Sequence, residues 1–349
     1  MTTAKRTGLS SASLATVAAK AGVSISTVSR VVNGQTHRAS AETVEKVRQV
    51  IAEVGYRPNH VGRSLRRQES RLVAMLVANL DNPVMATIAA STEAALRDAG
   101  YVMFLCDTHD RADLQDDYLY AMRSHGVQGY VLVACVPSPG LKEFSEGGVP
   151  IVFVSRRNPC GEGAFVGIDN IRAGADAADY LWSQGIREAA ALYPLQGSTV
   201  TRDRAAGFCD RLLSLGVPSD KILRLTAPGL SHKDVGYLAV RDLLTAGRQW
   251  PPGIMCVSDQ IAYGVYRAAR EANVVIPDDC TVVSIDGNAL NAWLAPWLTS
   301  ICVPHGDYGR EVVELLLSLW NGAGLSERIL QHQLGLPTQL QVDIPLKSL

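Results

Sequence analysis

The chain has 349 residues, of which 47% are hydrophobic and 19% are charged, and its formal net charge is −1 at pH 7. This length is comfortable for two or three domains, and the composition is that of an ordinary globular protein. No run approaches the roughly 18 apolar residues of a membrane span, and the N-terminus lacks the apolar core of a signal peptide. We therefore expect neither a membrane protein nor a secreted one.

The charge is divided unevenly along the chain. Residues 1–71 hold 12 Lys and Arg against 4 Asp and Glu, a balance of +8, whereas the rest holds 21 against 30, a balance of −9. A basic head on an acidic body is typical of a DNA-binding module joined to something else. A chance cluster of charge is the alternative.

The seven cysteines are widely spaced and odd in number, with no CxxC pair and no metal-ligand spacing to histidine. This pattern predicts free thiols in a reducing cytoplasm rather than a disulfide framework or a zinc site. No metal and no cofactor is therefore expected. Residues 1–12 are predicted to be a mobile basic tail.

The next stretch, residues 13–58, is predicted to be a helix-turn-helix domain. Ser13–Ala21 carries apolar residues at helical spacing, and Gly22 follows at a position suited to a tight turn. Val23–Asn33 is predicted to be the second helix, with Ser24 as its N-cap. Its apolar face is expected to contain Val28, Val31 and Val32.

A third helix is predicted over Ala41–Val54. Ser40 is its expected cap, Gly55 ends it, and Pro58 prevents its return. The buried stripe of this helix is expected to consist of Val44, Val47, Ile51 and Val54.

The free face of Val23–Asn33 has the residue types that read bases in the major groove. Ile25 can touch a thymine methyl group, the hydroxyls can reach bases or phosphates, and Arg30 can bridge guanine O6 and N7. The alternative for such a helix, taken alone, is core packing without any DNA contact.

Two segments together, ATVAAKAGVSISTVSRVVN and SAETVEKVRQVIAEVGYRPNHVGRSLR, resemble the DNA-binding head and hinge of the lactose-repressor/galactose-repressor family. The match runs from about Leu14 to Arg67. There are two departures, because the family usually has an acidic residue where Thr16 stands and alanine where Gly62 stands.

The resemblance implies a hinge helix within residues 59–71. In the family a leucine at the position of Leu65 wedges into the minor groove, which unstacks a base step, and Arg66 can follow it into the narrowed groove. The alternative is that the arginines here only solubilise a linker. The predicted DNA-binding residues are Ser24, Ile25, Ser26, Thr27, Ser29, Arg30, Asn33, His37, Asn59, Gly62, Leu65 and Arg66.

From Leu72 onward, short apolar runs alternate with amphipathic stretches, which is the pattern of parallel α/β sheets. Strands are predicted at Leu72–Val77, Tyr101–Cys106, Gly129–Ala134, Ile151–Val154, Ala189–Tyr193, Ile254–Val257 and Val282–Ile285. Helices are predicted at Met85–Ala99, Leu114–His125, Ala173–Ser183, Arg204–Leu215, Lys233–Ala246 and Ile261–Ala272.

As far as about Thr338, the chain resembles the family's effector-binding and dimerisation core, which is built like a periplasmic sugar-binding protein, and this core is assigned to residues 72–349. The resemblance implies an N-terminal lobe of about 72–168 and 301–332, and a C-terminal lobe of about 169–300 and 333–345. The crossings between lobes are expected near Ile168, Ser300 and His332.

Ligands of such folds bind in the cleft outside the carboxyl ends of the strands, so residues just after the apolar runs are candidates. Arg204 matches the family's effector-binding arginine, and Asp286 matches its acidic residue that accepts bonds from sugar hydroxyls. The predicted effector-binding residues are Asn82, Asp107, Ser155, Arg202, Arg204, Ser258, Asp259 and Asp286.

A capping role is the alternative for each of these candidates, and Asp259 in particular is placed to cap the helix that starts at Ile261. Two departures concern the ligand. Sugar-binding members often carry Asp where Ser155 stands and Asn or Asp where Ser258 stands. The effector's identity is therefore left open.

Two functions compete. The first is a transcriptional regulator, most often a repressor in this family, that binds near-palindromic operator DNA as a homodimer and responds to a small molecule, commonly a carbohydrate. The second is an enzyme of small-molecule metabolism with a DNA-binding head. No GxxxxGK[ST], HExxH or GxSxG motif is present, which favours the regulator, acting in the cytoplasm on the nucleoid. Whether the effector induces or corepresses is left open.

The tail after Thr338 contains Pro345 and no leucine heptads. It cannot form the C-terminal coiled coil that makes some relatives tetramers, so a dimer is expected.

Overall fold

The computed structural model describes residues 13–56, 70–229 and 231–337. The chain divides into two compact units, Met1–Ser70 and Arg71–Leu349, and each is described by itself. The predicted hinge helix lies outside the described residues, as do the predicted N-terminal tail and the C-terminal residues from 338 onward.

The first unit is a helix-turn-helix head, as predicted. Its helices are α1 (Leu14–Ala21), α2 (Ile25–Val32), the short η1 (Thr36–Arg38) and α3 (Ala41–Glu53). Ser13, Ser24 and Ser40 each cap a helix by accepting a hydrogen bond from the backbone N–H three residues later. Gly22, at φ 67°, makes the turn between α1 and α2 in a conformation that favours glycine.

The core of the head is made of valines and alanines from all three α-helices. Val17, Val28 and Val47 are fully buried within it. The predicted stripe of α3 needs one correction, because Val50 is buried with Val44 and Val47 whereas Ile51 and Val54 are only partly buried. The α3 positions 44, 47 and 50 recur every three residues, so they form one face of the helix.

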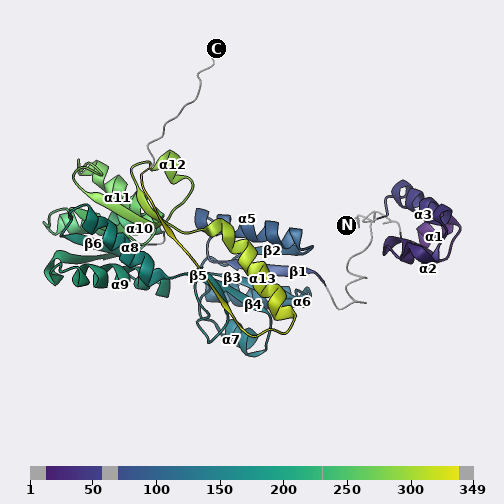
Figure 1. Cartoon of the computed structure of the whole chain (residues 1–349). Coiled ribbons are helices and arrows are strands. Elements are labelled where there is room, and N and C mark those ends of the chain that lie inside the picture. Colours follow the sequence, from purple (N-terminus) through teal and green to yellow (C-terminus); the bar gives the residue numbers. More distant parts are fainter. Residues whose placement is uncertain (1–12, 57–69, 230, 338–349) are drawn as a thin grey trace, which may run out of the picture. The chain divides into compact units, whose positions relative to one another are not determined.

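The second unit contains two six-stranded sheets, one per lobe (Figure 1). The sheet of the N-terminal lobe has the order β11-β5-β4-β3-β1-β2, and all its strand pairs are parallel. These strands are β1 (Leu72–Val77), β2 (Val102–Asp107), β3 (Gly129–Val133), β4 (Ile151–Val154), β5 (Ala164–Ile168) and β11 (Glu327–Leu330).

Helices cover both faces of this sheet. They are α5 (Pro83–Asp98), α6 (Ala112–Ser124), α7 (Pro139–Glu146) and α13 (Tyr308–Trp320). Helix α5 packs against α13, and α6 packs against α7. Alternate residues of β1 enter two different buried clusters, Val73 and Met75 in one and Ala74 and Leu76 in the other, because successive side chains of a strand point to opposite faces.

The sheet of the C-terminal lobe has the order β12-β10-β9-β8-β6-β7, and β12 is the antiparallel strand. Its strands are β6 (Ala189–Pro194), β7 (Ile222–Ala227), β8 (Gly253–Cys256), β9 (Thr281–Asp286), β10 (Thr299–Cys302) and β12 (Gln333–Gly335). The helical segments of this lobe are α8 (Asn170–Ser183), α9 (Thr199–Ser214), η2 (Ser219–Lys221), α10 (His232–Thr245), α11 (Asp259–Glu271) and α12 (Asn291–Leu294).

Glycines allow α8 and α9 to pack with their backbones in close contact. A Cβ atom on Gly174 of α8 would lie 2.1 Å from the carbonyl oxygen of Arg204, and one on Gly207 of α9 would lie 2.0 Å from that of Ile171. No larger residue fits at either position without moving a helix. This contact fixes where Arg204 stands relative to the start of α8.

The chain passes between the two sheets three times. It leaves the N-terminal lobe after β5, returns between β10 and α13 through η3 (His305–Asp307), and crosses again between β11 and β12. Strand β10 extends to Cys302, so the second crossing follows that residue, whereas the sequence placed it near Ser300. None of the helices in the described parts of the chain is long and apolar enough to cross a membrane.

The predicted strands and helices of the core are all present, with ends shifted by a few residues. Five strands were not predicted, namely β5, β7, β10, β11 and β12. Helix α9 begins at Thr199 rather than Arg204, because Ser198 caps it. The residues from Thr199 to Asp203 are mostly polar, so apolar periodicity does not indicate this first part of the helix.

Candidate functional site

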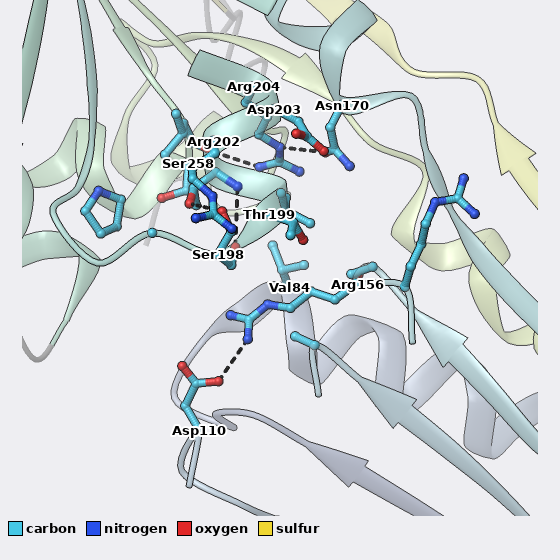
Figure 2. Close-up of a pocket in the computed structure, with 18 of the residues that line it drawn as sticks. Val84, Asp110, Arg156, Asn170, Ser198, Thr199, Arg202, Asp203, Arg204 and Ser258 are labelled. Atoms are coloured by element: carbon cyan, nitrogen blue, oxygen red, sulfur yellow. Dashed lines mark hydrogen bonds and ion pairs between the residues drawn. The ribbon is translucent and has the colours of Figure 1, made fainter. Parts of the chain in front are cut away.

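A cleft of about 1090 Å³ lies where the strand ends of both lobes meet. The N-terminal lobe contributes residues 134–137 after β3 and 155–159 after β4. The C-terminal lobe contributes residues 198–204 at the start of α9, together with Ser258 (Figure 2). Asp286 also belongs to this side of the lining. The cleft therefore occupies the position at which α/β folds bind their ligands.

Arg204 and Asp286 form a buried ion pair on the C-terminal side of this cleft. The distance from Nη1 to Oδ1 is 3.0 Å, and the two residues are 8% and 7% exposed. Arg204 also donates from Nη1 to the carbonyl of Val257, at 2.7 Å, and from Nε to Oδ1 of Asn170, at 2.9 Å (Figure 2). The guanidinium is thus held by three acceptors from three parts of the lobe.

The position of Arg204 corrects one detail of the sequence interpretation. Arg204 is not the first residue of its helix, because α9 begins at Thr199. Burial raises the pKa of Asp286 to about 7, even though Arg204 beside it favours the charged form.

Two strand ends at the cleft have an unusual backbone. Asp286, at the end of β9, has φ 147°, and Ser155, just after β4, has φ 65°. Residues other than glycine seldom adopt positive φ, and such strain tends to occur at functional sites because it positions a side chain for its task.

Four of the predicted effector residues line the cleft together with Arg204 and Asp286. They are Asn82, Ser155, Arg202 and Ser258. Asn82 also caps α5 by accepting from the N–H of Val84, at 3.0 Å, and Ser258 caps α11. Asn82 and Ser258 thus each cap a helix and also line the cleft. For these two residues, the capping role and the predicted effector-binding role are compatible.

Two predicted effector residues do not line the cleft. The carboxylate of Asp107 accepts hydrogen bonds from the backbone N–H groups of Leu80 and His109, both at 3.0 Å. Asp259 is 2% exposed, and Ser258, not Asp259, caps α11. The carboxylate of Asp259 accepts from Ser284, Ser300, Asn288 and Asn291, at 2.5–2.8 Å. Both carboxylates therefore accept hydrogen bonds from nearby donors, and neither lines the cleft.

Sequence reasoning missed several polar residues of the cleft, among them Asp110 and His232. Asp110 lies 3.0 Å from Nη1 of Arg156, the neighbour of the predicted Ser155 (Figure 2). His232 Nδ1 lies 2.8 Å from Oγ of Ser258. Asp110 stands three residues beyond β2, and His232 opens α10 after a loop with no apolar run, so neither follows a strand directly.

Charged side chains around the cleft are balanced in sign. The lining contains four arginines and four aspartates, which are Arg156, Arg157, Arg202, Arg204, Asp110, Asp169, Asp203 and Asp286. Trp and Tyr are absent from the described lining, whose one large aromatic residue is the buried Phe165. The cleft thus offers many directed donors and acceptors rather than one strongly charged pocket. Within the described residues, no cluster of His, Cys, Asp or Glu could hold a metal ion.

In the head, the predicted base-reading residues lie outside the core. Ser24, Ile25, Ser26, Arg30, Asn33 and His37 are exposed, and Thr27 and Ser29 are partly exposed. Ile25 is 54% exposed although it is apolar. Asn33 donates to the carbonyl of Ser29, at 2.7 Å, and so closes the end of α2. The predicted hinge contacts Asn59, Gly62, Leu65 and Arg66 lie outside the described residues.

Comparison with known proteins agrees with both units. Residues 13–59 match the model of bacterial regulatory proteins of the lacI family, and residues 178–342 match that of the periplasmic binding protein-like domain. The regulator DegA of Bacillus subtilis (strain 168) is 30% identical over 302 residues, which are 84% of this chain and 87% of that protein. The ribose operon repressor of Halalkalibacterium halodurans is also 30% identical, over 86% and 88% of the two chains.

Solved structures show the same architecture. A complex of the transcriptional regulator CelR with cellobiose is 26% identical, with a TM-score of 0.68 over 93% of this chain and 98% of that one. A lac repressor dimer bound to operator shares the fold at 24% identity, with a TM-score of 0.82 over 93% and 97% of the two chains.

A helix-turn-helix head joined to a two-lobed core of the periplasmic-binding-protein type defines a DNA-binding transcriptional regulator. The chain belongs to the lacI family of bacterial regulatory proteins. Its relatives are named as regulators and repressors, so we conclude that it is a regulator and not an enzyme with an added head.

Proposed function

We propose that this regulator is a repressor whose affinity for operator DNA is changed by a sugar or sugar derivative bound in the cleft. The buried Arg204–Asp286 pair carries this proposal, because it places a fixed donor fork and a fixed acceptor side by side at the ligand position of the fold. The ribose operon repressor and the CelR–cellobiose complex among the similar proteins support a carbohydrate.

The balanced charge of the cleft also supports an uncharged polyhydroxy ligand. A hydroxyl group both donates and accepts, so it can be shared between an arginine and an aspartate without a net charge. The four arginines and four aspartates of the lining provide such mixed positions. Ser155, Arg202 and Ser258 are proposed as further contacts, and Asn82 as a contact from the N-terminal lobe.

The proposed DNA-binding surface is the exposed face of α2, extended by His37. Arg30 has no ion-pair partner within the described part of the chain, so its guanidinium is available for a guanine. We further propose the domain limits 13–58 for the head, 59–71 for the hinge and 72–349 for the core, with the hinge contacts that the family resemblance implies at Asn59, Gly62, Leu65 and Arg66.

A homodimer on a near-palindromic operator is part of the proposal. The edge strand β2 exposes Val102, Phe104 and Leu105 at 59%, 40% and 42%, and α12 exposes Trp293 and Leu294 at 68% and 74%. Each lobe therefore presents an apolar patch, and such patches are common at protein interfaces. A two-fold dimer would set two heads on two half-sites of the chromosome, in the nucleoid.

The proposed mechanism links the cleft to the hinge through the N-terminal lobe. Strand β1 begins at Leu72, directly after the proposed hinge, so any movement of this lobe moves the point at which the head is attached. A ligand that contacts Arg204 and Asp286 in one lobe and Asn82 in the other changes the preferred arrangement of the lobes. Operator affinity then changes by the free energy that couples the two sites.

The test begins with a thermal-shift panel of sugars that includes D-ribose and cellobiose, applied to the wild-type chain and to Arg204→Lys. A binding sugar should stabilise the wild type and lose most of that effect in the variant. Sequencing of the genomic DNA bound by the purified protein then supplies the operator. A panel with no binding sugar, or a protein with no preferred DNA sequence, would overturn the proposal.

A further inference from the structure

His232 occupies a place in the cleft for which the proposed function has no role. It is the first residue of α10, lines the cleft and is partly buried. Its Nδ1 lies 2.8 Å from Oγ of Ser258, the residue that caps α11. The imidazole is thus tied to the neighbouring helix through one of its two ring nitrogens.

The other partner of Ser258 is consistent with donation from its hydroxyl to this nitrogen. As an N-cap, the hydroxyl oxygen accepts from the backbone N–H of Ile261, at 3.4 Å. A hydroxyl has one proton and two acceptor lone pairs, so Oγ can accept from Ile261 and donate its proton to Nδ1 of His232. In that arrangement Nδ1 accepts, and a neutral imidazole whose Nδ1 accepts carries its proton on Nε2.

The surroundings of His232 keep the ring neutral. Burial, together with the positive charges of Arg204 and Arg156, lowers its pKa to about 4, while Asp110 acts weakly in the opposite direction. Arg204 belongs to the C-terminal lobe, whereas Arg156 and Asp110 follow strands of the N-terminal lobe. The ring therefore lies within electrostatic reach of both sides of the cleft.

Nε2 is left open to the cleft. No described residue makes a hydrogen bond to it, and it is not among the buried polar atoms that lack a partner. A neutral N–H that is fixed in direction and open to a ligand cavity is a selective recognition group, because it can donate and cannot accept.

We propose that His232 binds the effector through Nε2–H as an obligate donor, and that Ser258 sets this role by fixing the tautomer. The proposal deepens the proposed function, since it assumes that the cleft is the effector site. The effector then has an oxygen acceptor at this position, such as a hydroxyl, ring or carbonyl oxygen. An analogue with an ammonium group there is excluded, because an ammonium has no acceptor.

The tautomer can be tested without any ligand. Full-length protein labelled with ¹⁵N-histidine is examined at pH 7 by two-bond ¹H–¹⁵N correlation spectra, and His232→Gln identifies the His232 signals among the seven histidines. We expect the Nε2–H tautomer in the wild type. An Nδ1–H tautomer, or a doubly protonated ring at this pH, would overturn the proposal.

Two substitutions of Ser258 make the test sharper because both keep a capping oxygen. Ser258→Asn still offers an N–H to Nδ1 and should preserve the Nε2–H tautomer. Ser258→Asp offers only an acceptor, so it should move a proton to Nδ1. If Ser258→Asp leaves the tautomer unchanged, as Ser258→Asn is expected to do, Ser258 does not fix the tautomer of His232. The part of the proposal that concerns Ser258 is then wrong.

The ligand role is tested by calorimetry with a sugar that binds the wild type, starting with D-ribose and cellobiose. His232→Gln, which keeps an N–H at a similar reach, should bind within a few-fold of wild type, whereas His232→Phe should bind about tenfold or more weakly, as expected for one lost hydrogen bond. Equal binding by His232→Phe and wild type would overturn the proposal.

The controls separate this proposal from the proposed function. If His232→Phe binds normally while Arg204→Lys does not, the cleft is the effector site and only the His232 role fails. If neither substitution weakens binding, or if no sugar in the panel binds, the proposed effector site itself fails, and the tautomer spectra then report a structural role for His232 alone.

Discussion

The guanidinium of Arg204 and the carboxylate of Asp286 pair with each other, with Nη1 3.0 Å from Oδ1 and both residues buried. An effector that binds both residues therefore does not find two free groups. It must share or replace an existing ion pair, so part of its binding energy offsets the loss of that pair. Selectivity follows, because a ligand lacking either a donor or an acceptor at this point leaves one buried charge unpaired.

The first prediction concerns the stability of this pair. Arg204→Met leaves Asp286 buried without its cation and also frees the carbonyl of Val257, so it should lower the free energy of unfolding by about 3–5 kcal/mol. The double variant Arg204→Met/Asp286→Leu removes both charges and should recover much of that loss. Urea unfolding of the wild type, both single variants and the double variant measures the coupling. Strictly additive losses would contradict the pairing.

The second prediction concerns pH and His305, which lines the cleft and is 8% exposed. Burial, with a smaller contribution from Arg204, lowers its pKa from 6.5 to about 3. Below pH 6.5 the unfolded chain binds a proton at this residue and the folded chain does not. The free energy of unfolding is therefore unaffected by the titration of His305 above pH 6.5. It decreases as the pH falls from 6.5 toward 3, by about 1.4 kcal/mol per pH unit at most.

The comparison with His305→Gln isolates this effect. His232, whose pKa is also lowered in the folded chain, decreases the free energy of unfolding at low pH as His305 does. Asp286, whose pKa is raised in the folded chain, has the opposite effect between about pH 4 and 7. The difference in unfolding free energy between wild type and His305→Gln should therefore change steadily in favour of the variant from pH 6.5 to 4.5. A difference that does not depend on pH would show that His305 titrates normally when folded.

The third prediction concerns base reading by α2. Arg30→Ala should weaken binding to the operator by about 1–3 kcal/mol and weaken binding to random DNA much less, provided that the guanidinium contacts a guanine. Arg48, an exposed arginine of α3, supplies the matched control through Arg48→Ala. Fluorescence anisotropy at one salt concentration measures both affinities. An equal loss on operator and random DNA would make Arg30 a phosphate contact.

The fourth prediction concerns the proposed hinge. Leu65→Ala should reduce both operator bending and operator affinity, because a wedged apolar side chain unstacks the central base step. Sugar affinity of the DNA-free protein should be unchanged. Circular-permutation gel shifts report the bend directly, and a wild-type bend angle in the variant would exclude the wedge role.

Local rules explain why much of the fold could be predicted. Ser24 and Ser40 were recognised as caps because a cap depends on its own hydroxyl and on an N–H three residues later. Strands β1 and β4 were predicted with the correct ends because each is a continuous apolar run. Strand β7 was missed because it is an edge strand that interleaves Arg224 and Thr226 with apolar residues.

The site was less predictable because side-chain direction depends on distant partners. Arg204 and Asp286 are 82 positions apart, and family resemblance, not any local pattern, brought them together. Asp107 ends strand β2 and Asp259 lies shortly after β8, yet their carboxylates accept from nearby donors instead of lining the cleft. His232 gave no signal, because its role depends on Ser258, which lies 26 residues further along the chain.

The most direct test measures how the two proposed sites influence each other. Operator affinity is determined by anisotropy with and without a saturating concentration of the binding sugar, in the wild type and in Arg204→Lys. We expect the sugar to change operator affinity of the wild type by roughly 5- to 150-fold, with sugar affinity changed by the same factor when operator is bound. Arg204→Lys should bind operator normally and respond little to the sugar. Operator affinity that is the same with and without saturating sugar in the wild type would contradict the account.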